Sequence, residues 1–311
     1  IYRIDLTNPS LSDTYNPFFN TSPTIAKDMM INMTDWSEEH YKVNAERYLQ
    51  RLILMMNKAK IPLSFQSIIK FMELDNFALL SSQLVKSKII SKEKHIENLE
   101  ISHTSGKISE SSIARFSTIA ESELGHLFTD NGIDIATALQ ENAIILFILN
   151  PLIYPELSPA FGRLVLIDSK KAISQRFKNC NRTFFIFDEI NVYASKTLID
   201  LVNKSRSANV TCVLATQSLS DLASAEDENF TQQIIENCNN YLVLRQNSAV
   251  NSENWSNILG TRPTMDVTYQ LQQKGFDTIQ TGLGSARNVR EFLYHPDDIK
   301  KLQTGKGIFL S

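Results

Sequence analysis

The spacing of hydrophobic positions changes along this 311-residue chain, from a pattern typical of strands to one typical of helices and back again. Short runs rich in β-branched and aromatic residues, bounded by polar or turn-forming residues, predict strands. These runs are residues 1–6, 143–149, 184–187, 210–215, 241–244, 289–293 and 307–310. Helical spacing separates several of them, most clearly at 158–177. The pattern therefore predicts an α/β fold with buried parallel strands.

A helical stretch interrupts the alternation of strands and helices. Residues 7–22 are rich in Asn, Pro, Ser and Asp and predict a loop. Apolar residues then recur every three or four positions to about residue 130, which predicts a mostly helical module that includes helices at 64–71 and 75–85. The lysine-rich segment 86–107 predicts a solvated, mobile loop rather than a dedicated DNA-binding patch, although the latter stays an alternative.

The candidate chemistry lies between residues 183 and 217. The strand predicted at 184–187 is apolar throughout, which indicates burial on both faces. A helical pattern and the second strand, at 210–215, follow it directly. Strand, helix and strand of this length predict a βαβ unit whose two strands are parallel neighbours.

Polar residues follow both of these predicted strands. Asp188 and Glu189 come directly after the first, and Thr216 and Gln217 come after the second. Ligands of open α/β sheets lie outside the carboxyl ends of the strands, so we expect Asp188, Glu189 and Gln217 along one rim. This is the geometry of a nucleotide-hydrolysing motor.

The residue types suit that chemistry. Asp188 can hold Mg²⁺, usually through water because this cation dehydrates reluctantly. Glu189 can orient or deprotonate an attacking water, and Gln217 can sense the γ-phosphate or position the same water. The alternative is that Asp188 and Glu189 merely cap the following helix, whose N-terminal dipole favours carboxylates.

Composition narrows the class of protein. The chain is 42% hydrophobic and 21% charged, with a net charge of −3, which argues against a bulk electrostatic grip on nucleic acid but leaves a local basic lining open. Cys180, Cys212 and Cys238 lie far apart, so we expect reduced thiols and no disulfide or zinc framework. No run of apolar residues is long enough to predict a membrane span.

A phosphate-cradling loop of the form G-x-x-x-x-G-K-[ST] is missing from the sequence, and the nearest stretch, 305–307, lacks both the upstream glycine and the hydroxyl residue. Because the chain opens in a strand-like run at Ile1, we expect a fragment whose phosphate loop precedes that residue and which alone hydrolyses ATP poorly or not at all. Toward the C-terminus, helical signals at 267–273 and a glycine turn at 282–285 are expected.

The chain resembles the coupling ATPases of type IV secretion and bacterial conjugation, of the TraG/TraD kind, and more distantly the FtsK-like ring translocases. The resemblance rests on several stretches in order, with the helical insertion matched by position only. These stretches are the Tyr15-Asn16-Pro17-Phe18 motif after the first strand, the Walker B run at 184–189, the "ATQSxxDL" segment at 215–222, Gly282-x-Gly284-Ser285, and His295-Pro296-Asp297-Asp298-Ile299.

The resemblance implies roles for matching positions, with ATP and Mg²⁺ as cofactors. Asp188 is then the Mg²⁺-associated carboxylate, Glu189 the residue that activates water, and Gln217 the γ-phosphate sensor, with Thr216 beside it at the nucleotide. Arg206 lies where the family places an arginine that reaches into the neighbouring subunit's site and stabilises developing phosphoryl charge.

Two points about the cations stay open. Lys204 is a weaker candidate for the same role as Arg206. The alternative for Arg206 itself is a cation that the C-terminal dipole of a helix favours, and the two interpretations weigh about equally.

The implied fold is a RecA-like P-loop NTPase sheet flanked by helices, with an inserted all-α domain. Residues 1–22 would form the opening strand and loop of the nucleotide-binding domain, 23–132 the inserted all-α domain, and 133–311 the remainder of the nucleotide-binding domain.

The implied function is an ATPase and DNA translocase that recruits relaxase-bound DNA, or protein substrates, to a type IV secretion channel. It would act as a homo-hexamer that binds DNA without sequence preference, in contact with relaxosome proteins and channel components. It would be cytoplasmic, at the inner face of the bacterial membrane through an anchor absent from this sequence. The alternative is a recognition module, in which the insertion captures the relaxosome and the α/β part is mainly scaffold.

Overall fold

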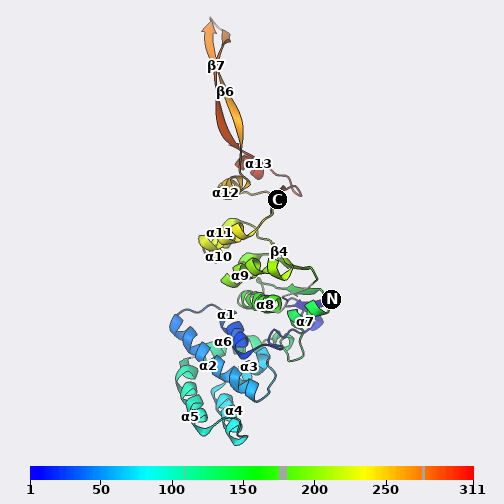
Figure 1. The fold of residues 1–311 in the computed structure, drawn as a ribbon, viewed down its shortest axis with the longest axis vertical. Helices are drawn as coiled ribbons and strands as arrows, with labels where there is room; N and C mark the ends of the chain where they lie inside the picture. Colours follow the sequence, from blue (N-terminus) through cyan, green and yellow to red (C-terminus); the bar gives the residue numbers. More distant parts are fainter. Residues whose placement is uncertain (109, 175–180, 275–276) are drawn as a thin grey trace. The chain divides into compact units, whose positions relative to one another are not determined.

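The computed structural model describes residues 1–108, 110–174, 181–274 and 277–311 (Figure 1). The chain divides into two compact units, 1–215 and 216–311, and each is described by itself.

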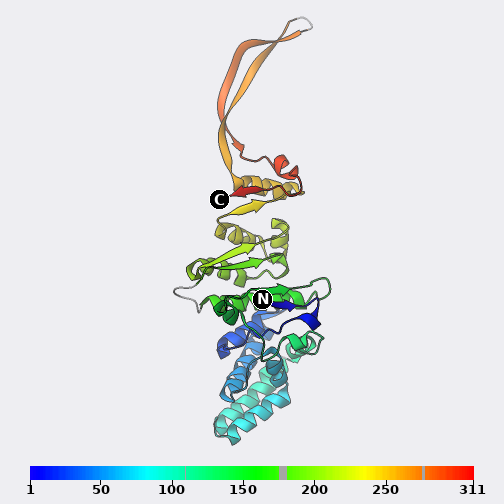
Figure 2. The same cartoon turned by 90° about the vertical axis from the view of Figure 1, so that its right-hand side faces the viewer.

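Two pairs of parallel strands form the α/β part of the first unit. Strand β1 (Tyr2–Asp5) pairs with β2 (Ile145–Ile148), and β3 (Thr183–Phe187) pairs with β4 (Val210–Leu214) (Figure 2). Helix α9 (Lys196–Ser205) connects β3 to β4, as parallel strands require a crossover connection. The predicted βαβ unit is therefore present, and its strands are parallel neighbours as expected.

The first unit also contains a 3₁₀ turn after β1 and two helices, one on either side of β2 in the sequence. They are the 3₁₀ turn η1 (Pro9–Leu11) and the helices α7 (Ile135–Gln140) and α8 (Leu157–Ser174). Of the helix expected at 158–177, residues 175–177 lie outside the described residues, as does Cys180. Cys212 and Cys238 are not linked by a disulfide.

The burial of β3 differs from the sequence-based expectation. Phe187 is buried and Phe185 packs against the hydrophobic core, but Phe184 and Ile186 are 56% and 73% exposed. The prediction of a strand buried on both faces is wrong. Successive side chains of a strand point to opposite faces, and here Phe185 and Phe187 pack inward while Phe184 and Ile186 are exposed.

Helices α1 to α6 follow β1 and precede α7 in the described part of the chain (Figure 1). They are α1 (Pro23–Asn32), α2 (Glu39–Lys58), α3 (Phe65–Met72), α4 (Leu74–Lys86), α5 (Lys92–Ile101) and α6 (Glu110–Ala120). Serine side chains cap α1 and α3: Ser22 accepts a hydrogen bond from the amide of Ile25, and Ser64 forms a capping box with Ser67. The predicted helical stretch is thus present.

Most of the lysine-rich segment 86–107 is helical, from Lys92 onward, and only residues 87–91 form a turn, so the expectation of a loop over the whole segment is wrong. The Oγ atom of Ser91 accepts a hydrogen bond of 3.2 Å from the amide of Lys94 and starts α5. Asn98 and Ile101 are buried against the other helices, and the π-helix η2 (Ser102–Gly106) continues α5. Burial of one side of the segment decided its conformation, which the run of lysines concealed.

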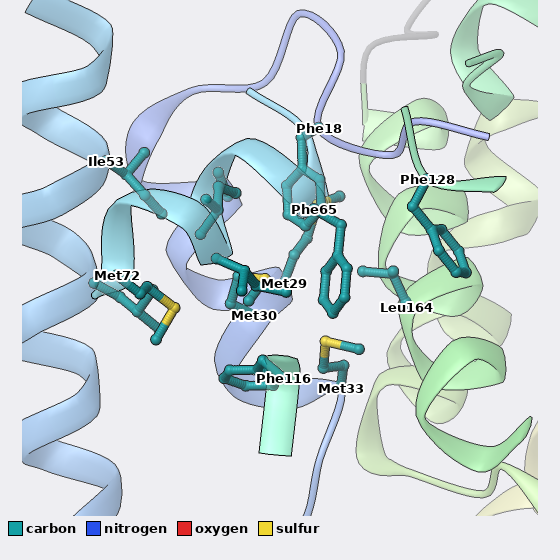
Figure 3. Packing of buried hydrophobic residues seen from close by; sticks show 14 of the residues in the cluster. Phe18, Met29, Met30, Met33, Ile53, Phe65, Met72, Phe116, Phe128 and Leu164 are labelled. Carbon is teal, nitrogen blue, oxygen red and sulfur yellow. The ribbon is translucent and has the colours of Figure 1, made fainter. Parts of the chain in front are cut away.

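One hydrophobic core joins these helices to α8 within the first unit. Figure 3 shows Phe65 of α3 facing Leu164 of α8, with Met33 and Phe116 close by. The ring of Phe65 lies edge-on to that of Phe116, with centroids 6.3 Å apart. The helical insertion is therefore packed on the same helix that flanks the strands.

A buried ionic cluster fastens the loop after β1 to α8. The ammonium of Lys171 lies 2.9 Å from Oδ1 of Asp168 and 3.4 Å from Oδ2 of Asp134, and all three side chains are almost fully buried. Lys171 also donates a hydrogen bond of 2.8 Å to the carbonyl of Pro17, and the hydroxyl of Tyr15 donates to Asp168. Burial raises the pKa of Asp168, although the neighbouring ammonium counteracts part of the shift.

In the described residues of the second unit, 216–274 and 277–311, there are two antiparallel strand pairs and four α-helices. Strand β5 (Tyr241–Val243) pairs with β8 (Ile308–Leu310), and β6 (Thr261–Lys274) pairs with β7 (Asp277–Phe292) in a long ribbon (Figure 2). The helices are α10 (Leu219–Ala225), α11 (Glu228–Asn237), α12 (Ala249–Leu259) and α13 (Pro296–Lys300). Throughout the described parts of both units, no helix is long and apolar enough to cross a membrane.

The ribbon contradicts two expectations. Residues 267–273, expected to be helical, lie within β6, and the glycine turn expected at 282–285 lies within β7. The ribbon has the period of two that a strand requires, because Asp266 pairs with Arg287 on one face while Met265 and Val267 lie on the other.

Candidate functional site

The candidate site lies at the carboxyl end of β3. Asp188 and Glu189 follow Phe187 directly and both are exposed. The end of β4 lies beside them, because the amide of Ala215 donates to the carbonyl of Phe187 at 2.8 Å and the amide of Ile190 donates to the carbonyl of Ala215 at 3.1 Å. The two carboxylates therefore lie at the strand ends of the parallel pair.

The backbone turns sharply between the two carboxylates. Glu189 adopts a left-handed conformation with φ of 48°, which costs a residue other than glycine about 1 kcal/mol or more. Its amide donates a hydrogen bond of 3.0 Å to Oδ1 of Asp188, and its carbonyl accepts from Val192 at 2.9 Å in the 3₁₀ turn η4 (Ile190–Val192). The backbone therefore leaves the strand at Glu189 and enters the turn η4.

The capping alternative for these carboxylates has little support. The long helix that follows, α9, begins only after Ser195, seven residues beyond Asp188. Glu189 does precede the short turn η4, but its side chain makes no capping hydrogen bond there. The position of the pair is thus explained by the end of the strand and not by a helix start.

Tyr193 supports this turn, and the sequence analysis did not identify it. Its hydroxyl donates a hydrogen bond of 2.7 Å to the backbone carbonyl of Asp188, and the residue is 8% exposed. Burial and the nearby Asp188 and Glu189 carboxylates raise the pKa of Tyr193, so the hydroxyl keeps its proton. A tyrosine five positions after a carboxylate follows no periodic pattern, so this contact could only be found from the fold.

The carboxylates fit a magnesium ion that keeps most of its water. Within the described ranges, no three His, Cys, Asp or Glu side chains are grouped closely enough to form a protein metal cage. Mg²⁺ sites that include substrate phosphates use only one or two carboxylates, and the exposed side chain of Asp188 leaves room for water ligands.

Arg206 lies near the amino ends of the β3–β4 strand pair, opposite the carboxyl ends where Asp188 lies. It is exposed and opens the 3₁₀ turn η5 (Arg206–Ala208), which follows the C-terminus of α9. The carbonyl of Asn209 then accepts from the amide of Thr183, the first residue of β3. A five-residue strand spans roughly 16 Å, so Arg206 and Asp188 of one chain do not share a site. Lys204, in the last turn of α9, lies near the same end of the strand pair.

Thr216 and Gln217 open the second unit. The hydroxyl of Thr216 donates to the carbonyl of Ser218 at 3.2 Å, and the Oγ atom of Ser218 accepts from the amide of Asp221 at 3.1 Å to begin α10. Gln217 is exposed between them. Its role as a γ-phosphate sensor stays a prediction.

Comparison with known proteins adds sequence and fold relationships. Residues 182–304 match the family model described as the TraM recognition site of TraD and TraG. An uncharacterized protein of Mycoplasma pneumoniae is 26% identical over 132 residues, which is 42% of this chain and 83% of that protein.

Solved structures of a conjugative coupling protein have a similar fold. The bacterial conjugative coupling protein TrwBdeltaN70, in its unbound form, matches with a TM-score of 0.69 and 16% identity, over 99% of this chain and 70% of its own. The plasmid coupling protein TrwB in complex with ADP and Mg²⁺ matches with a TM-score of 0.61 and 17% identity, over 97% of this chain and 69% of its own. The resemblance to the TraG/TraD coupling proteins is thus confirmed, in sequence over residues 182–304 and, over almost the whole chain, as a RecA-like α/β fold with an all-α insertion.

Proposed function

We propose that the protein is a coupling ATPase that drives DNA, or protein-bound DNA, into a secretion channel during conjugation. The single observation that carries this proposal is the pair of exposed carboxylates at the carboxyl end of β3, with Glu189 in a left-handed turn, in a fold shared with TrwB. TrwB binds ADP with Mg²⁺, which supports ATP and Mg²⁺ as the cofactors here.

Each site residue has a separate task in this proposal. Asp188 holds the cation through water, and its Oδ1 atom is oriented by the amide of Glu189. The bound Mg²⁺ supplies neutralising charge at the phosphate oxygens. Glu189 orients the attacking water and accepts its proton.

Thr216 and Gln217 would contact the nucleotide phosphates from the end of the second strand. Gln217 follows Ala215 by two peptide units, each of which spans about 3.8 Å between Cα atoms. The amide and carbonyl of Ala215 are both hydrogen-bonded to the residues around Asp188. The proposed role of Gln217 rests on its position in the sequence directly after the end of β4.

Arg206 would act between subunits. Its position at the amino end of the strand pair, away from Asp188, excludes it from the site of its own chain but suits a residue that reaches the site of a neighbour. An arginine supplied in this way stabilises phosphoryl charge in the transition state. The protein would then be active as a ring, for which a homo-hexamer is our proposal.

The partners follow from the same reasoning. The family model that matches 182–304 is described as a recognition site for TraM, which supports a relaxosome protein of the TraM type as a partner of this part of the chain. We propose that the insertion spans residues 23–132 and that residues 1–22 and 133–311 form the nucleotide-binding domain. The insertion would face the DNA or relaxase. The protein would work on the cytoplasmic side of the membrane, next to the secretion channel.

A recognition module without motor activity is the second candidate, favoured by that same description of residues 182–304. ATP turnover with and without DNA, in the protein as the cell makes it, separates the two. DNA-stimulated turnover that Glu189→Gln abolishes is the expected result. If the wild-type protein bound a relaxosome partner but turned over no ATP under any DNA condition, the motor proposal would be wrong.

A further inference from the structure

We propose that Tyr193 is a positioning residue: packed against helix α8, it holds the backbone turn between Asp188 and Glu189 in place. This inference rests on the proposed ATPase function, because the turn matters only if its carboxylates act on a nucleotide. It assigns a role to a side chain whose hydroxyl bonds the backbone of Asp188 and not its carboxylate.

The hydrogen bond places the support at the right point of the backbone. The hydroxyl of Tyr193 donates to the carbonyl of Asp188, which belongs to the peptide unit that joins the two carboxylate residues. Rotation of this peptide unit would change ψ of Asp188 and φ of Glu189 together. A donor held 2.7 Å from that carbonyl therefore opposes relaxation of the left-handed conformation of Glu189.

The ring of Tyr193 packs against helix α8. Gly162 lies in the middle of α8, and a Cβ atom at this position would lie 2.7 Å from both Cβ and Cγ of Tyr193. Real Cβ atoms do not approach so closely, so only a glycine permits this packing. A glycine inside a helix costs about 1 kcal/mol relative to alanine, and here it allows the ring to lie against the helix.

The loop around the tyrosine is buried on the side away from the carboxylates. Ile190 is 1% exposed and Ala194 is 3% exposed, whereas Asp188 and Glu189 face solvent. The loop is thus anchored to the core while its reactive side stays accessible. A packed side chain that fixes a reacting group is what precise orientation of an attacking water requires, since misplacement by about 1 Å can cost roughly 100-fold in rate.

Two substitutions separate the hydroxyl from the packing. Tyr193→Phe keeps the ring against α8 and removes only the donor to Asp188. Gly162→Ala keeps the hydroxyl but displaces the ring. Tyr154→Phe is the matched control, because the Tyr154 hydroxyl also donates a hydrogen bond in the first unit, of 2.8 Å to Glu123, away from the carboxylates.

The test combines steady-state ATP hydrolysis by the intact protein with amide hydrogen exchange over residues 188–192. For Tyr193→Phe and Gly162→Ala we expect kcat to fall by about 10- to 100-fold with an unchanged KM for ATP, and faster exchange confined to this loop. Tyr154→Phe should change neither. If only the packing of the ring mattered and the hydroxyl did not, Tyr193→Phe would keep the wild-type kcat. That result would overturn the proposal.

The exchange measurement keeps this inference separate from the function itself. If the wild-type protein shows no ATP turnover, the proposed function fails and exchange alone decides about the turn. Unchanged exchange at 188–192 in Tyr193→Phe would then overturn the positioning role, and faster exchange there would support it. A raised KM with unchanged kcat would also overturn it, because the hydroxyl would then serve nucleotide binding.

Discussion

The hydroxyl of Tyr15 donates a hydrogen bond of 2.8 Å to Oδ2 of Asp168, 153 positions further along the chain. The ammonium of Lys171 forms an ion pair with the other carboxylate oxygen of Asp168, Oδ1, and donates a hydrogen bond to the carbonyl of Pro17. The Tyr-Asn-Pro-Phe motif therefore has a structural explanation: its first and third residues bind Asp168 and Lys171, the two members of the buried ionic cluster that lie on α8. Removing a partner from such a cluster leaves an unpaired charge in the core.

The first prediction concerns this cluster. Lys171→Met should lower the free energy of unfolding by about 3–5 kcal/mol, because two buried carboxylates lose their ammonium. Urea denaturation measures the change. The neighbouring Lys170→Met is the control, since Lys170 pairs with Asp200 at the surface and should cost about 1 kcal/mol or less. Equal midpoints for the two variants would contradict the structural role.

The second prediction is a pH dependence at Asp5. Burial opposes ionisation of its carboxylate, but hydrogen bonds from the amides of Thr7 and Asn8, with the Arg3 guanidinium, hold the pKa of Asp5 below its usual value. A lowered pKa in the folded state means that the unfolded chain binds the proton more readily. Stability from Asp5 is therefore present above about pH 4, the unfolded pKa, and is lost as the pH falls through the folded pKa.

Asp5→Asn should remove this contribution, so wild-type and variant stabilities should converge as the pH falls below 4. Urea titrations at successive pH values measure the difference. Asp13→Asn is a suitable control, because Asp13 accepts an exposed hydrogen bond from the amide of Arg3. A constant gap between wild type and Asp5→Asn at every pH would show that Asp5 acts through packing and not through its charge.

The third prediction tests the left-handed turn. Glu189→Gly should be more stable than Glu189→Ala by about 1 kcal/mol, because glycine adopts positive φ without strain. Glu46, within helix α2, should show the opposite order, with glycine about 1 kcal/mol less stable than alanine. Both Glu189 variants should lack ATP turnover. The same order at both positions, measured by urea denaturation, would argue against strain at Glu189.

The fourth prediction tests whether Arg206 acts on a neighbouring subunit. Arg206→Ala and Glu189→Gln should each abolish ATP turnover when alone, the arginine being worth about 10³-fold or more in rate. Mixed before assembly, the two inactive variants should recover part of the activity. Some interfaces then combine an intact Glu189 from one subunit with an intact Arg206 from another.

A matched mixture checks this interpretation. Glu189→Gln mixed with Asp188→Ala should stay inactive, because both changes affect the same side of every interface. Recovery in that mixture, or none in the first one, would place Arg206 outside the site. The C-terminal helix dipole would then be the sufficient explanation for a cation at this position.

The sequence predicted the parts of the fold that depend on local pattern. The βαβ unit, the helical stretch and the carboxylates at the end of β3 were all expected, because strand and helix periods and the rule for ligand positions are local or topological. Its errors occurred where tertiary packing decides. Residues 92–106 are helical and bury Asn98 and Ile101, and the apolar β3 leaves Phe184 and Ile186 exposed.

The amino-acid order by itself thus determined which chemistry is present: Asp188 and Glu189 must follow a strand, and Arg206 must follow a helix. Only the tertiary structure decided which groups meet. It packs Tyr193 against Gly162 and links Tyr15 to Lys171 through Asp168. It also places Arg206 at the end of the strand pair away from Asp188. Such contacts join residues far apart in sequence or without periodic spacing, so they arise only when the hydrophobic core brings whole elements together.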